Sequence, residues 1–128
     1  MPDSDEFASP RCVQILDENY LQHWEASVGS AMMPHFIDEL MNTFEHSYAE
    51  QVVKIDLACQ QENTEVLISL VHYVKGSLGN LGLARAAAYA RQAETELRIG
   101  KFQRFSVFSA KLDYHKTQGL KALKARYD

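Results

Sequence analysis

The residues best suited to chemistry form a short run around His72, which combines a histidine, a lysine and glycines. Lys75 follows His72 by three residues, and Gly76 and Gly79 follow it by four and seven. At about 100° per residue these positions share one side of a helix. An exposed, neutral imidazole is a nucleophile, and the lysine would offset the charge of a phosphoryl group placed on it. The spacing therefore favours phosphoryl chemistry at His72.

The two glycines need an explanation, because each glycine inside a helix costs about 0.5–1 kcal/mol relative to alanine. On an outward face, packing does not require small residues. We interpret Gly76 and Gly79 as clearance that lets the backbone of a partner approach the imidazole. Ile68 and Ser69, which precede His72 by about one turn, are predicted to belong to the same docking surface.

The elements that position this run are predicted to be helices. The three prolines are at positions 2, 10 and 34, so no later residue forbids a helix. Apolar residues recur at steps of three and four over 34–60, 64–82, 83–97 and 102–127, and a short helix over 17–29 precedes them. The sequence therefore predicts an all-α fold, an antiparallel four-helix bundle with the short N-terminal helix capping one end.

The helical wheel also assigns faces. Asp17 is predicted to cap the first helix, with Leu16 and Leu21 as its hydrophobic staple, and Asn63 or Thr64 to cap the third. Alanines of the fourth helix should let a neighbour approach closely, and in the last helix Phe105 should point inward while Lys116 faces water. The remaining histidines are predicted to be surface or boundary residues: His23, His35, His46 and His115.

The run from His72 to Gly82 resembles the signature of histidine-containing phosphotransfer (HPt) domains, in which a histidine precedes Lys, Gly and Ser at these spacings. The resemblance implies a four-helix bundle in which His72 is the phosphoacceptor, Lys75 its charge partner and Gly76 the clearance residue. It departs from the family pattern at Leu78, where a small residue is usual. The wheel places Leu78 inward, so this change should affect packing rather than chemistry.

The resemblance also implies partners. Proteins of this family relay phosphate between the aspartates of response-regulator receiver domains in multistep two-component phosphorelays that begin at a hybrid sensor histidine kinase. The chain should therefore be a phosphocarrier without a cofactor of its own, with Mg²⁺ supplied by the receiver domain. Family members carry a polar residue and a cation on the next helix beside the site, and Glu94 and Arg98 are the candidates here.

Length and composition narrow the function classes. With 128 residues we expect one domain, residues 13–128, after a flexible acidic tail over residues 1–12. A net charge of −4 argues against nucleic-acid binding, and no apolar run is long enough to cross a bilayer. Two cysteines and the lack of a secretory signal predict a cytoplasmic protein, or also a nuclear one in a eukaryote. We expect a monomer.

Three other functions make different demands on the sequence. A di-metal bundle needs Glu-x-x-His, which does not occur, so no metal site is expected. A complete histidine kinase needs nucleotide-binding loops, and these are missing, as is the proline that typically follows the phosphoacceptor of a kinase. The remaining alternative is a non-catalytic helical adaptor that binds a signalling partner through the glycine-lined face.

Overall fold

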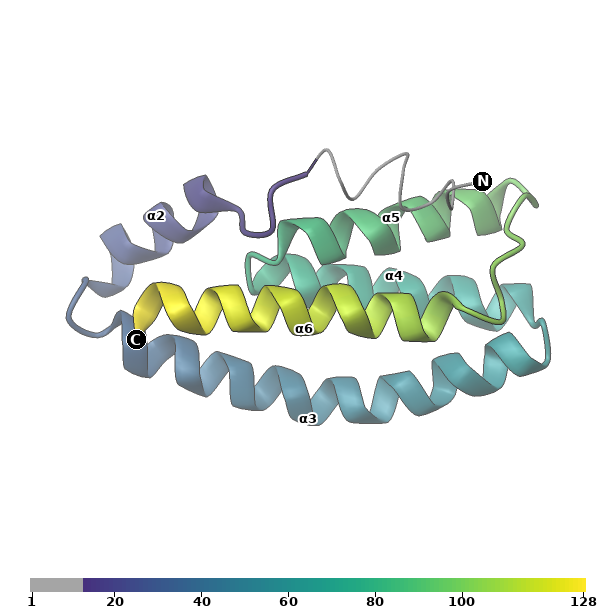
Figure 1. Ribbon diagram of the computed structural model, residues 1–128, viewed down its shortest axis with the longest axis horizontal. Coiled ribbons are helices and arrows are strands. Elements are labelled where there is room, and N and C mark those ends of the chain that lie inside the picture. The colour runs from purple at the N-terminus through teal and green to yellow at the C-terminus, as the bar shows by residue number, and fades with distance from the viewer. Residues whose placement is uncertain (1–12) are drawn as a thin grey trace.

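Five helices follow one another in the computed structural model, which describes residues 13–128. They are α2 (Glu18–Val28), α3 (Met33–Gln60), α4 (Thr64–Asn80), α5 (Ala84–Arg98) and α6 (Phe108–Tyr127). Helices α3 to α6 run alternately up and down as a bundle, and α2 lies at the end where α3 begins and α6 finishes (Figure 1). The predicted all-α bundle with an end-capping helix is confirmed. The predicted acidic tail lies outside the described residues.

Side-chain caps set the starts of two helices. The carboxylate of Asp17 accepts a hydrogen bond from the backbone N–H of Tyr20 at 3.1 Å, as predicted for the start of α2. Asn63, one of the two candidate caps of α4, accepts from the backbone N–H of Val66 at 3.3 Å. Both members of the predicted staple around Asp17 are buried.

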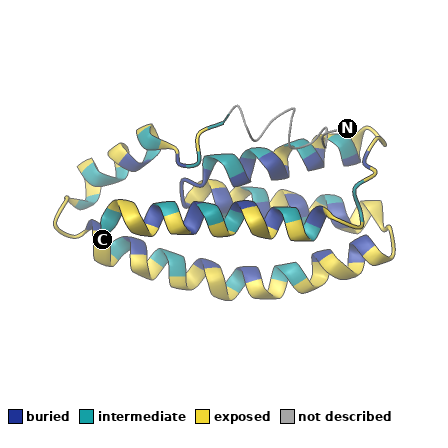
Figure 2. Cartoon of the chain, viewed as in Figure 1, coloured by how far each residue is buried: buried dark blue, intermediate teal, exposed yellow. Residues whose placement is uncertain are grey.

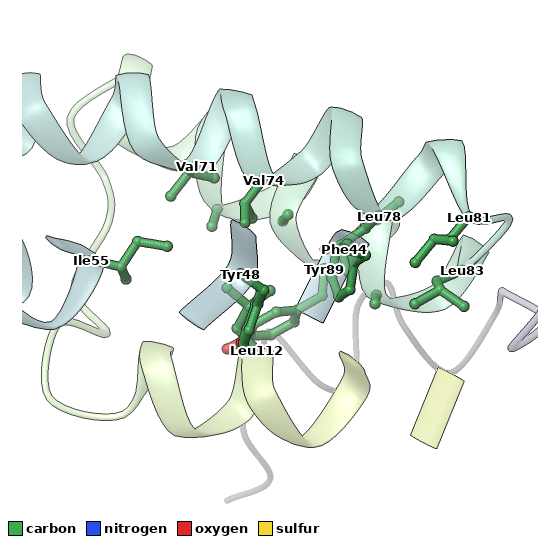
Figure 3. Close-up of a cluster of buried hydrophobic side chains, with 14 of the residues drawn as sticks. Phe44, Tyr48, Ile55, Val71, Val74, Leu78, Leu81, Leu83, Tyr89 and Leu112 are labelled. Carbon is green, nitrogen blue, oxygen red and sulfur yellow. The ribbon is translucent and has the colours of Figure 1, made fainter. Parts of the chain in front are cut away.

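The core lies between the four long helices. Buried positions face the bundle axis and exposed positions face outward along each helix (Figure 2). In Figure 3, Val74 and Leu78 of α4 belong to one cluster of buried side chains with Phe44 and Tyr48 of α3 and Leu112 of α6. Leu78 is fully buried, so its size serves packing, as the wheel predicts. This inward face of α4 leaves its opposite face for the chemistry.

Hydrogen bonds between residues far apart in the sequence attach α2 to the end of the bundle. The backbone N–H of Asp17 donates to the carbonyl of Gly82 in the turn between α4 and α5, at 2.8 Å. Gly82 has a φ of 75°, a conformation that glycine adopts without strain. Glu25 of α2 accepts from Tyr127 at 2.7 Å and from Arg126 at 2.9 Å, both on α6. These hydrogen bonds link the capping helix to the turn between α4 and α5 and to α6.

The last helix begins later than predicted. It starts at Phe108 rather than Phe102, and the preceding residues form a loop that carries a partly buried Phe105. Phe102 packs edge-on against Phe105 and Phe108, at centroid distances of 4.9 and 5.6 Å. Arg104 forms an ion pair with Glu96 and covers the Phe102 ring. These contacts stabilise the non-helical segment and override its helical pattern.

Two predictions on α6 are wrong. His115 is buried rather than at the surface, and it packs against the Tyr89 ring at a centroid distance of 4.9 Å. Lys116 does not face water, since only 13% of its side chain is exposed. Its ammonium lies 4.7 Å from the centroid of the Tyr48 ring and 3.4 Å from Asp113. Its aliphatic stem covers apolar surface while the charge keeps partners.

A matched pair of glycine substitutions tests this packing. A Cβ on Gly119 of α6 would lie 3.1 Å from a methyl carbon of the fully buried Leu83, whereas a Cβ on Gly79 would meet nothing within 4 Å. Gly79→Ala should therefore stabilise the fold by up to about 1 kcal/mol. Gly119→Ala should lose that gain to overpacking of about 1–3 kcal/mol. Urea unfolding of both variants checks the order, and equal stabilities would contradict it.

Candidate functional site

His72 lies in the middle of α4, on the face turned away from the core. Its side chain is 62% exposed, as the wheel predicts. One turn earlier, Ser69 is exposed and Ile68 is half-buried against the core. Val71 and Val74 occupy the opposite, fully buried side, so the packing of α4 holds the imidazole outward.

The glycines beside His72 leave that face open. Gly76 and Gly79 are exposed, and a Cβ placed on either would meet no heavy atom within 4 Å. Packing inside the bundle therefore does not require glycine at these positions. The structure brings His72, Gly76 and Gly79 together on one surface, and the docking role of that surface stays a prediction.

The second helix of the site, α5, contributes a buried carboxylate. Glu94 lies four residues after Ala90 and three before Leu97, both fully or nearly fully buried. Only 7% of its side chain is exposed. A charged side chain is rarely buried unless it is paired.

Three side chains satisfy this carboxylate. Oε1 accepts from the ammonium of Lys75 at 2.7 Å. Oε2 lies 2.9 Å from Nδ1 of His72 and accepts from Arg98 Nε at 3.0 Å and from its terminal nitrogen at 2.6 Å. Two cations and the imidazole therefore meet at one anion.

These partners keep Glu94 ionised. Burial alone would raise the pKa of this carboxyl, but the hydrogen bonds from Lys75, Arg98 and His72 outweigh it and lower the pKa from 4.5 to about 2. Near neutral pH the group is a carboxylate, which accepts hydrogen bonds and donates none.

The ionised carboxylate determines which nitrogen of His72 carries the proton. Because Glu94 can only accept, Nδ1 of the ring must be the donor in their 2.9 Å contact. In a neutral imidazole the other nitrogen, Nε2, then holds the free lone pair. The exposed ring therefore presents Nε2 as its nucleophile.

Both predicted cations lie at the site, but their partner in the structure is Glu94. Lys75, which the sequence predicts as the charge partner of a phosphoryl group on His72, is only 26% exposed and pairs with the buried carboxylate. Arg98, the candidate cation of the next helix, is 55% exposed and pairs with the same group. Both cations are therefore held within the site by Glu94.

Glu94 is the residue whose importance the sequence reasoning underestimated. It appeared only as a candidate neighbour implied by the family resemblance. A signal was available, because the glutamate continues the three-and-four spacing of the small buried residues of α5. A carboxylate in a buried stripe indicates a partner on the facing helix.

The pH dependence of stability tests the Glu94 network. Because the pKa of the folded group lies below its ordinary value of 4.5, Glu94 contributes stability that is fully present above pH 4.5 and lost as pH falls toward 2. The difference in melting temperature between the wild type and Glu94→Gln should therefore change between pH 6 and pH 3, with the wild type losing more. A difference independent of pH would contradict the assignment.

Within 13–128, no group of three or more His, Cys, Asp or Glu side chains is placed to hold a metal ion. None of the helices described is both long and apolar enough to span a bilayer.

Comparisons with known proteins agree with this fold. The structure resembles the crystal structure of histidine-containing phosphotransfer protein B (HptB) from Pseudomonas aeruginosa PAO1, with a TM-score of 0.68 and 21% identity, over 88% of this chain and 94% of that one. No curated protein sequence matches the chain. The sequence pattern of the Hpt domain matches residues 39–125, which include α4, α5 and most of α3 and α6. The chain belongs to the Hpt domain family.

Proposed function

We propose that this protein carries a phosphoryl group on Nε2 of His72. In this proposal it accepts the group from the aspartate of one response-regulator receiver domain and passes it to the aspartate of another, in a phosphorelay that begins at a hybrid sensor histidine kinase. The observation that supports it most directly is the exposed imidazole with Nδ1 bonded to a buried carboxylate. That contact leaves Nε2 free to attack phosphorus.

Lys75 and Arg98 support the same assignment. A phosphoryl group is largely dianionic near pH 7, and charge-assisted hydrogen bonds to it are strong. Both cations already contact the carboxylate that holds the ring. They therefore lie close enough to the ring for their charge to favour the phosphorylated state.

The open face around His72 supports docking of a receiver domain. Gly76 and Gly79 remove side chains one and two turns beyond the imidazole, and Ser69 and Ile68 flank it on the other side. We propose that these positions contact the receiver, which also supplies the Mg²⁺ and acidic pocket used in phosphoryl transfer.

The test is to mix the protein with a phosphorylated receiver domain and Mg²⁺. We expect acid-labile, alkali-stable label on this chain, located at His72 by mass spectrometry. Labelled ATP and Mg²⁺ without a receiver should give no phosphohistidine, because a phosphocarrier has no nucleotide site. Tight binding of the receiver without any label would instead favour the helical adaptor.

A further inference from the structure

Glu94 contacts the ring nitrogen opposite the one that would carry phosphate. The protonation of this nitrogen, Nδ1, affects how readily the phosphoryl group leaves the ring. When it carries a proton, the ring is an imidazolium and leaves phosphorus as neutral imidazole. Without that proton the ring must leave as an imidazolate anion, which is a far poorer leaving group.

We propose, on the basis of the phosphocarrier function above, that Glu94 sets the lifetime of the phosphohistidine by holding a proton on Nδ1 of the phosphorylated ring. Glu94 contacts the ring at Nδ1 and not at the nitrogen that would carry phosphorus, so it acts as a positioning residue through His72. The 2.9 Å contact and the burial of the carboxylate carry this inference. An opposite charge at this distance favours the protonated ring. The carboxylate is only 7% exposed, so water screens its charge little.

Transfer of the phosphoryl group to and from His72 does not require a proton to move. On acceptance, the Nε2 lone pair forms the N–P bond, and the P–O bond of the aspartyl phosphate breaks with its electrons on the aspartate. The ring becomes an imidazolium that already holds its Nδ1 proton. On donation, a carboxylate oxygen of the second aspartate bonds to phosphorus, and the N–P electron pair returns to Nε2. Glu94 remains a carboxylate throughout, in agreement with its pKa of about 2.

The charges around the ring act in opposite directions. His72 and Lys75 face Glu94 from α4, and Arg98 faces it from α5. The carboxylate favours an imidazolium, whereas the two cations disfavour it. Removing the carboxylate should therefore destabilise the protonated ring, and removing Arg98 should stabilise it.

The experiment measures the lifetime of the phosphoprotein against pH without any receiver. Wild type, Glu94→Gln and Arg98→Gln are phosphorylated chemically with phosphoramidate, and loss of phosphate from each histidine is followed by phosphorus NMR and mass spectrometry. His46, exposed on α3, is the internal reference. The midpoint pH of the lifetime profile at His72 is the readout.

In Glu94→Gln the midpoint at His72 should move to lower pH, and the lifetime at pH 8 should increase about tenfold or more. In Arg98→Gln the midpoint should rise. The profile of His46 should stay the same in all three proteins.

An unchanged midpoint in Glu94→Gln would overturn the inference. Should that variant fail to fold, a midpoint in Arg98→Gln that does not rise would overturn it equally. The outcome is independent of the proposed function, which fails instead when no receiver domain labels His72.

Discussion

His72→Gln should abolish phosphoryl acceptance from a receiver domain while leaving the fold unchanged. Glutamine has no ring nitrogen to attack phosphorus, so the loss should be complete rather than partial. The replaced side chain is exposed, and Glu94 would still be paired with Lys75 and Arg98. The melting temperature should therefore change by no more than a few degrees, as is usual for surface substitutions.

The matched control is His46→Gln, which alters another exposed histidine on a neighbouring helix. It should accept label at the wild-type rate. The measurement is incorporation of labelled phosphate, together with circular dichroism on the same preparations. Full labelling of His72→Gln would show that another residue is the phosphoacceptor.

Gly76→Gln should raise the stability of the fold while it slows phosphoryl transfer. Gly76 is exposed, and a Cβ there meets nothing within 4 Å, so the new side chain fits without strain. Glutamine is a better helix former, so the variant should gain up to about 1 kcal/mol of stability. Yet its long side chain would lie one turn beyond His72, on the surface where we propose that the receiver docks.

Transfer in Gly76→Gln should therefore fall by about tenfold or more, corresponding to at least about 1.4 kcal/mol of lost docking free energy. Such a trade is expected where a poor helix former is kept for function. Ala49→Gln, at an exposed position of α3, is the control and should transfer at the normal rate. Transfer rates and thermal unfolding are measured together. Normal transfer in Gly76→Gln would remove the docking role of this glycine.

Much of the fold was readable from local spacing. The starts of α2 and α4 follow from Asp17 and Asn63, which act within three residues of themselves. The inward stripe of α4 and the exposure of His72 follow from the helical period, because burial of one face places the other in solvent. These features depend on residues a few positions apart.

Features that depend on distant residues were not readable in this way. The loop before α6 follows the packing of Phe102 and Arg104 against other helices, and Lys116 is held over the Tyr48 ring of α3. A helical wheel places a residue on a face but does not identify the side chain that will meet it there.

The same division holds at the site. The sequence by itself determined the outward face of α4, namely an exposed His72 with two glycines on one helical face, because that arrangement needs only the period of a single helix. Only the tertiary structure decided which nitrogen of the His72 ring carries the proton. Glu94 follows His72 by 22 residues, and its 2.9 Å contact exists because α5 packs beside α4 with its small residues facing inward. That contact leaves Nε2 as the ring nitrogen with the free lone pair. The same carboxylate also draws Lys75 into a part-buried pair, because a buried carboxylate must find donors wherever the neighbouring helix supplies them.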